Sequence, residues 1–253
     1  MRTDLMLRAS DLRAQRKPFV MATVVRAQRP TSAKAGDTAL ILADGTLDGF
    51  VGGTCATSTV LAQGLRLLTT GESTLLHITP SAGDAPAEEG AVTVANPCLS
   101  GGALDIFLEP MLPPPLVHVL GDAPVARALA ALGGPLGYQV TAVVDPSAPI
   151  PPDAVAVVVA SHGHDEEPVL TAALRTGVPY VALVASRRRG SAVLSSLDVD
   201  TSAVHSPAGL DIGARTAPEV ALSILAEIIA SRPRAAPPPP VVPPKASLLP
   251  VLE

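Results

Sequence analysis

Residues 116–145, LVHVLGDAPVARALAALGGPLGYQVTAVVD, switch from one repeating pattern to another and back. Runs of Val and Leu at both ends are typical of buried strands, and the segment between them, which closes on Gly133 and Gly134, is typical of a helix. The alternation continues through residues 154–186, AVAVVVASHGHDEEPVLTAALRTGVPYVALVAS. Strands that alternate with helices of this length form parallel sheets with crossover helices. We therefore predict a Rossmann-like domain with a mainly parallel sheet over residues 116–231.

The last helix of this domain is marked at its start. Thr216 and Glu219 have the spacing of a capping box, Pro218 falls in the first turn, and ALSILAEIIAS supplies an apolar stripe. Beyond it, residues 232–253 are rich in proline. We expect a disordered or extended polyproline tail there, outside any core.

The N-terminal half has a different organisation. Residues 1–17 predict a short amphipathic helix, and residues 18–110 hold short strand-like runs, a hairpin turn at Asp44-Gly45 and a helix that ends at Gly71. A Pro-rich linker, 111–115, follows. The chain is therefore predicted to be α/β, with a mixed α+β domain before the Rossmann-like domain.

The composition excludes several classes of protein. Apolar residues make up 47% and charged residues 16%, as in a globular protein. With 2% aromatic residues and a net charge of -5, the chain lacks the stacking platforms and basic face of a nucleic-acid binder. We find neither a signal peptide nor a run of roughly 18 apolar residues. We therefore expect a cytoplasmic protein with no membrane span, whose two cysteines are thiols.

Both cysteines lie in glycine-rich loops. Cys55 follows a glycine pair at the start of a predicted helix, where thiolates are favoured and a ligand can approach the backbone. Cys98 precedes a second pair, which favours a shared site, although a buried cysteine acting as a small hydrophobe is the alternative. Zinc is not favoured, because CxxC spacing is missing. The expected ligand-contacting residues are Gly52, Gly53, Cys55, Cys98, Gly101 and Gly102.

The Rossmann-like half carries an incomplete dinucleotide fingerprint. Gly121 follows a predicted strand, and Asp145 closes the next one, where a ribose-binding acid is expected. Ala123 and Ala126 replace the second and third glycines of the GxGxxG pattern. The pattern fits a Rossmann architecture and gives weak support for NAD.

Two polar clusters follow later strands of the same half. SHGHDEE contains His162 and His164, which could do acid–base work or hold a metal. The alternative is a polar loop in which Asp165 caps the next helix. The run Arg187–Arg189 either clamps a phosphate or is solvated surface.

Five segments, in order between residues 18 and 231, resemble the motifs of the XdhC/CoxI family, accessory proteins of xanthine dehydrogenase and carbon monoxide dehydrogenase. They are GFVGGTCATSTV, PCLSGGALDIFLEP, SHGHDEEPVLTAAL, VALVASRRRG and SPAGLDIGARTAPEVALSILAEII, of which GLDIGARTAPEVALSILAEI is the most specific. The family resembled has an XdhC/CoxI domain followed by a Rossmann domain, which agrees with the pattern above.

The resemblance implies a maturation chaperone, with no catalytic residues of its own. Such a protein binds the molybdenum cofactor, as molybdopterin or its cytosine dinucleotide form, during sulfuration and insertion into a molybdenum hydroxylase apo-enzyme. The implied partners are that apo-enzyme and a cysteine desulfurase-type sulfur donor. Cys55 would contact molybdenum or its sulfido ligand. The remaining residues expected to contact the cofactor are Gly52, Gly53, Cys98, Gly101, Gly102, Gly121, Asp145, His162, His164 and Arg187.

The chain departs from the family pattern near Cys55, and two other functions are alternatives. Thr57 stands where the family often has glutamate, which removes a carboxylate from the first loop. One alternative is an NAD(P)-dependent oxidoreductase with His162 or His164 as acid–base group. Another is a scaffold whose proline tail recruits a partner. Homodimerisation is expected from its general frequency among soluble proteins.

Overall fold

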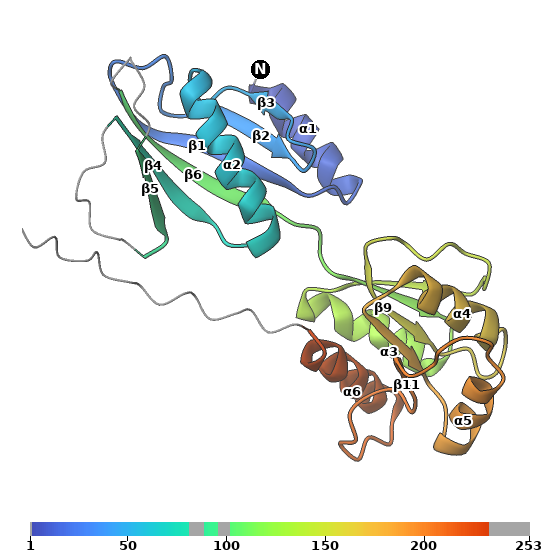
Figure 1. Ribbon diagram of the computed structural model, residues 1–253. Helices are drawn as coiled ribbons and strands as arrows, with labels where there is room; N and C mark the ends of the chain where they lie inside the picture. The colour runs from blue at the N-terminus through green and yellow to red at the C-terminus, as the bar shows by residue number, and fades with distance from the viewer. Residues whose placement is uncertain (1, 81–88, 96–101, 233–253) are drawn as a thin grey trace, which may run out of the picture. The chain divides into compact units, whose positions relative to one another are not determined.

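The structure, a computed structural model, describes residues 2–80, 89–95 and 102–232. The chain divides between Pro113 and Pro114 into two compact units, coloured blue to green and green to red in Figure 1. This division falls inside the Pro-rich segment 111–115.

The N-terminal unit is built on a six-stranded sheet of order β3-β2-β1-β6-β4-β5. Neighbouring strands are antiparallel except β4 and β5, which are parallel. The last strand along the chain, β6, lies between β1 and β4 in the middle of the sheet. The elements are α1 (Arg2–Ala14), β1 (Phe19–Gln28), β2 (Thr38–Leu42), β3 (Leu47–Gly49), α2 (Thr54–Thr70), β4 (Thr74–Thr79), β5 (Ala91–Ala95) and β6 (Ala103–Met111).

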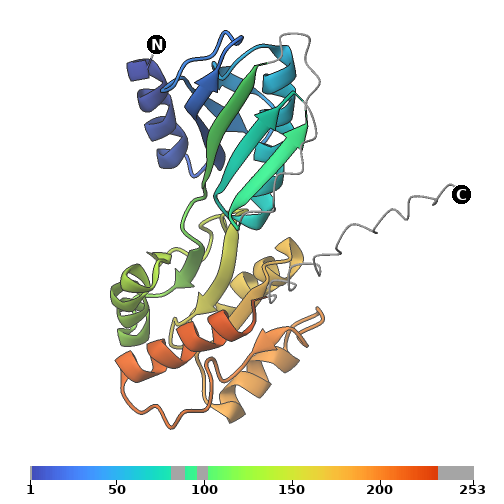
Figure 2. The ribbon, with the colours of Figure 1, turned by 90° about the vertical axis from the view of Figure 1, so that its left-hand side faces the viewer.

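The two helices of this unit cover opposite faces of its sheet (Figure 2). Alternate residues of a strand point to opposite faces, so Val20 packs in the core under α2 while Phe19 packs with α1. The predicted end of α2 is confirmed: Gly71 has φ 73° and its N–H donates to the carbonyl of Leu67. The helix predicted over 1–17 is α1, which packs on the sheet through Leu5 and Leu12.

The C-terminal unit has a five-stranded, wholly parallel sheet of order β11-β10-β9-β7-β8. Helices α3 and α6 pack on one face and α4 and α5 on the other. The predicted Rossmann-like architecture is confirmed. The elements are β7 (Leu116–Leu120), α3 (Pro124–Gly133), η1 (Gly134–Leu136), β8 (Gln139–Val143), β9 (Ala154–Val159), α4 (Glu166–Thr176), β10 (Tyr180–Leu183), α5 (Arg187–Ser195), β11 (Val204–His205) and α6 (Ala217–Ala230).

The start of α6 agrees with the sequence prediction. Thr216 is the N-cap, its hydroxyl accepts a bond from the Glu219 N–H at 3.4 Å, and the Glu219 carboxylate accepts one from the Thr216 N–H at 2.9 Å. Helix α5 and strand β11 were not predicted from the sequence. Helix α5 is short and polar, and its start at Ser186 coincides with the arginine run.

Candidate functional site

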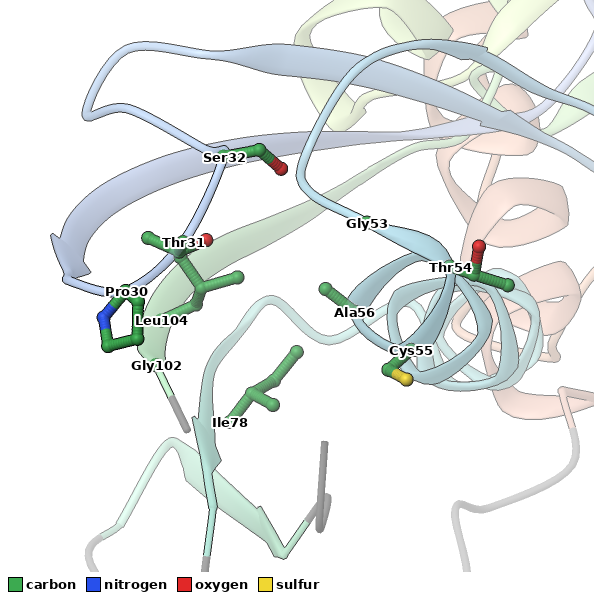
Figure 3. Close-up of a pocket in the computed structure, with 10 residues that line it drawn as sticks. All are labelled: Pro30, Thr31, Ser32, Gly53, Thr54, Cys55, Ala56, Ile78, Gly102 and Leu104. Atoms are coloured by element: carbon green, nitrogen blue, oxygen red, sulfur yellow. The ribbon is translucent and has the colours of Figure 1, made fainter. Parts of the chain in front are cut away.

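A cavity of about 640 Å³ lies in the N-terminal unit, at the end of α2 where that helix begins (Figure 3). Its walls come from the segment after β1, from the first turn of α2 and from strands β4 and β6. The lining residues are Pro30, Thr31, Ser32, Gly53, Thr54, Cys55, Ala56, Ile78, Gly102 and Leu104. Three of the residues expected to contact a ligand, Gly53, Cys55 and Gly102, are thus brought together.

The start of α2 presents backbone to this cavity. Gly53 is the N-cap, and because glycine has no side chain it cannot cap the first N–H groups of the helix. A Cβ at Gly53 would meet no atom within 4 Å, so the space beside it is open. The first N–H groups of a helix lack partners within the helix and carry partial positive charge. The local structure is therefore suited to an anionic group.

Cys55 is exposed and belongs to the first turn of α2. Its backbone carbonyl accepts bonds from the hydroxyls of Ser58 and Thr59, at 3.0 and 3.1 Å. Thr57 donates its hydroxyl to the carbonyl of Gly52 at 3.3 Å and does not line the cavity. At this position, where the family often has a carboxylate, the side chain therefore bonds to the loop before α2.

Two other glycines shape the wall of the cavity. A Cβ at Gly102 would collide with the backbone carbonyl of Pro30, so glycine allows the two segments to approach closely. Gly52 is buried, has φ 137°, and a Cβ there would lie 3.0 Å from that of Ala56. We find a packing role for both glycines. Cys98 and Gly101, expected in the same site, lie outside the described residues.

The wall formed by Pro30, Thr31 and Ser32 was not predicted from the sequence. The available signal was a polar Pro-Thr-Ser turn directly after a predicted strand. Only the pairing of β1 with β6, which brings Gln28 opposite Ala103, places this turn beside Gly102.

In the Rossmann-like unit, Gly121 and Asp145 of the incomplete fingerprint make contacts with neighbouring residues of the fold. Gly121 has φ 111°, and a Cβ there would collide with the carbonyl of Ala160, so this glycine permits close packing after β7 and β9. Asp145 accepts bonds from the N–H and the hydroxyl of Ser147, at 2.8 and 2.6 Å. These bonds, led by the one from the hydroxyl, lower the pKa of Asp145.

A second cavity, of about 620 Å³, lies outside the carboxyl ends of β9, β10 and β11. It brings together His162 and Arg187, both expected in a ligand site, whereas His164 does not line it. The lining residues are His162, Val184, Ala185, Ser186, Arg187, Arg189, Val220, Ser223 and the segment 207–214.

Glu166 fixes the loop that holds His162. It is 2% exposed, pairs with the Arg189 guanidinium, and accepts a bond from the Gly163 N–H at 3.0 Å. Asp165 occupies the N-cap position of α4 but makes no side-chain cap bond there. The structure thus assigns the local anchoring role to Glu166, where the sequence had suggested Asp165.

Glu227 on α6 anchors the segment that leads from β11 into the second cavity. Its carboxylate accepts bonds from the Tyr180 hydroxyl at 2.6 Å and the Gly209 N–H at 2.8 Å, and lies 3.0 Å from His205 Nδ1. Burial alone would raise the pKa of Glu227, but these bonds outweigh it and the net shift is downward. Burial and the same carboxylate raise the pKa of Tyr180.

A similar cluster crosses three strands of the N-terminal sheet. Asp105 on β6 is 9% exposed and lies 2.5 Å from Arg26 Nε and 2.8 Å from His77 Nδ1. Burial raises the pKa of Asp105, but the bonds from His77 and Arg26 outweigh it, so the net shift is downward. Asp105 alternates with Leu104 and Ile106, which pack under α2, so the cluster lies on the opposite face.

Neither a cluster of metal-ligating side chains nor a membrane-spanning helix is found in residues 2–80, 89–95 and 102–232. There, no three or more His, Cys, Asp or Glu side chains come together as a metal site would require. Across the same residues, no helix has the length and apolar character needed to cross a membrane.

The chain is similar to known proteins over most of its length. It is 28% identical over 259 residues to the uncharacterized protein YqeB of Escherichia coli (strain K12), an alignment that covers 89% of this chain and 46% of that protein. The chain thus spans about half the length of this relative. The crystal structure of a xanthine dehydrogenase from Bacillus halodurans aligns with 17% identity and a TM-score of 0.44, over 92% of this chain and 97% of that one.

Two domain models match the two units in turn. The model of the XdhC and CoxI family matches residues 12–79, and that of the XdhC Rossmann domain matches residues 117–228. The matches follow one another in the order that the sequence motifs predicted. Since both domain models of one family match in order and together take in most of the chain, the chain belongs to the XdhC and CoxI family.

Proposed function

We propose that this protein binds the molybdenum cofactor and acts as a chaperone in the maturation of a xanthine dehydrogenase-type molybdenum hydroxylase. Membership in the XdhC and CoxI family supports the target class. The observation that carries the proposal is the cavity of the N-terminal unit, where Gly53, Cys55 and Gly102 meet at the start of α2.

The residues of this cavity fit the chemistry of the cofactor. Molybdopterin combines a phosphate, a flat polar pterin and a metal-binding dithiolene. The uncapped start of α2 offers backbone N–H groups to an anion, because Gly53 leaves the approach open. The hydroxyls of Thr31 and Ser32 supply polar contacts, and Ile78 and Leu104 supply an apolar wall. The volume of about 640 Å³ falls within the usual range for small-molecule sites.

Each part of the site has a separate task in this proposal. The helix start binds and orients the anionic end of the cofactor, and the apolar wall keeps water from the rest. Cys55, exposed in the first turn, lies where a thiol can contact the metal end. When bound, the cofactor supplies the molybdenum centre that the hydroxylase uses in its own reaction. Carrying it requires affinity and protection from water.

The partners follow from this role. The cofactor passes to a molybdenum hydroxylase apo-enzyme, and a cysteine desulfurase-type donor supplies sulfur while the chaperone holds it. We place both encounters in the cytoplasm, where thiols stay reduced. The cofactor is bound as molybdopterin or in its cytosine dinucleotide form.

The test is the pterin content of the full chain, expressed in a host that makes molybdopterin and purified without oxygen. Fluorescence after oxidation should reveal bound pterin in the native protein. Cys55→Ala should lose it, and so should Gly53→Leu, whose side chain would extend into the open space beside the helix start. Thr69→Ala is the matched control, because Thr69 is exposed on the same helix and does not line the cavity.

Two results would contradict the proposal. One is a native protein without pterin from a host whose cofactor synthesis is verified. The other is equal pterin content in the native protein and in both cavity variants.

A further inference from the structure

We propose that the cavity of the Rossmann-like unit is a separate site for a nucleoside diphosphate, whose phosphates are bound by Arg187, Arg189 and the start of α5. This goes beyond the cofactor site of the N-terminal unit, with which it shares no residue. The position suits a ligand, since open parallel sheets bind ligands outside the carboxyl ends of their strands.

The mouth of the cavity carries a weak ion pair that a phosphate can replace. Arg187 lies 3.6 Å from Asp211, and their side chains are 84% and 88% exposed. Ion pairs this exposed contribute little to stability, because water screens them. A phosphate binds a guanidinium through two parallel hydrogen bonds, which makes it a stronger partner than a single loose contact. The Asp211 carboxylate therefore competes with a phosphate for the Arg187 guanidinium.

The second guanidinium, that of Arg189, is oriented by a buried carboxylate. Arg189 pairs with the buried Glu166, and Gly163 packs so closely that a Cβ there would lie 3.2 Å from Arg189 Nη2. Because a guanidinium has five N–H donors in a rigid fork, the bond to Glu166 orients the group and leaves other donors for a ligand. The partial positive charge at the start of α5, N-capped by Ser186, adds to both cations.

The walls of the cavity are fixed by close packing. A Cβ at Gly190 would collide with the Ser206 hydroxyl, and a Cβ at Gly209 with that of Ser223, so both glycines allow neighbouring segments to approach. Gly209 is also tied to α6 through its hydrogen bond to Glu227. The site is therefore shaped before a ligand arrives, which reduces the entropic cost of binding.

The size and the apolar wall select the class of ligand. A volume of about 620 Å³ is much larger than a phosphate ion needs and suits a nucleotide. Val184, Ala185 and Val220 form an apolar wall beside the charged groups. An uncharged base and ribose would lie against that wall while the phosphates reach the cations.

The test is calorimetric titration of the full chain with ADP, GDP, CDP and UDP, with the four corresponding nucleosides, and with inorganic pyrophosphate. At least one diphosphate should bind more tightly than either pyrophosphate or its own nucleoside. Arg187→Gln should weaken that binding roughly tenfold or more, as expected for a lost charged hydrogen bond. Asp211→Asn should strengthen it about threefold by removing the competitor.

Two control variants test whether the loss of affinity is specific to this cavity. Arg188→Gln changes the next arginine of the same helix, which does not line the cavity, and should leave the affinity unchanged. Cys55→Ala should also leave it unchanged, which separates this site from the proposed cofactor site. The proposal is overturned if no diphosphate binds at millimolar concentration, if a nucleoside or pyrophosphate binds as tightly as the diphosphate, or if Arg188→Gln has the same effect as Arg187→Gln.

Discussion

Replacing Glu227 by alanine should destabilise the C-terminal unit far more than an ordinary surface change on α6. The carboxylate accepts bonds from Tyr180 and Gly209 and pairs with His205. Tyr180 is 1% exposed, so water would not readily replace its lost partner. An unsatisfied buried donor costs about 1–3 kcal/mol. The variant leaves the buried Tyr180 hydroxyl and the half-buried Gly209 N–H without this acceptor, and leaves His205 without its carboxylate partner. We expect a loss of about 4 kcal/mol in the free energy of unfolding.

The chain contains its own reporter for this measurement. It has no Trp and only two Tyr, Tyr138 and Tyr180, both in the C-terminal unit. Tyrosine fluorescence during urea denaturation therefore follows that unit without interference from the other. With a slope of about 2 kcal/mol per molar urea, the midpoint should fall by about 2 M. Leu222→Ala, on the exposed side of α6, is the control and should shift it by less than about 0.5 M.

The pH dependence gives a second check with a definite sign. Because the pKa of Glu227 is lowered on folding, its contribution is fully present above its ordinary value of 4.5 and is lost as pH falls through the folded value. The stability gap between the native chain and Glu227→Ala should therefore narrow in acid. A midpoint shift no larger than that of Leu222→Ala, or a gap that stays constant from neutral pH into acid, would refute the reasoning.

Three further predictions concern other parts of the chain. Asp105→Asn should destabilise the N-terminal unit by about 2 kcal/mol. Because folding lowers the pKa of Asp105, this loss of stability should become smaller as the pH falls below the ordinary pKa of 3.8. Amide hydrogen exchange on β4 and β6 measures both the loss and its pH dependence. Gly102→Ala, which collides with Pro30, should lower pterin retention at an unchanged tyrosine-detected midpoint. Thr216→Ala removes the cap of α6 and should cost about 1 kcal/mol in urea denaturation followed by tyrosine fluorescence.

Local signals in the sequence were sufficient for the architecture. The alternating pattern from residue 116 onward predicted the parallel sheet, and the capping box at Thr216 and the glycine at Gly71 marked helix ends correctly. These features depend on neighbouring residues, so a single sequence can show them. Helix α5 was missed because its polar first turn, Arg187–Arg189, resembles a loop.

The candidate sites could be predicted only in part. Gly53 and Cys55 were predicted together because they are close in sequence. Gly102 was predicted because it belongs to a second glycine pair that lies beside a cysteine. The turn at Thr31 joins them only through the pairing of β1 with β6, which no local pattern records. Glu166 likewise appeared as one charge in a polar run, and only the fold shows that it is buried beside Arg189.

The central place of β6 in the N-terminal sheet has a consequence for synthesis. A nascent chain that ends near residue 80 already carries Cys55 and α2, but β1 and β4 still lack the strand that joins them. The cavity wall at Gly102 and Leu104 arrives with that strand. Because the closing contacts link segments far apart in sequence, they form late and cooperatively. The ribosome must therefore finish the whole unit before the pocket exists, so an incomplete chain lacks the cavity.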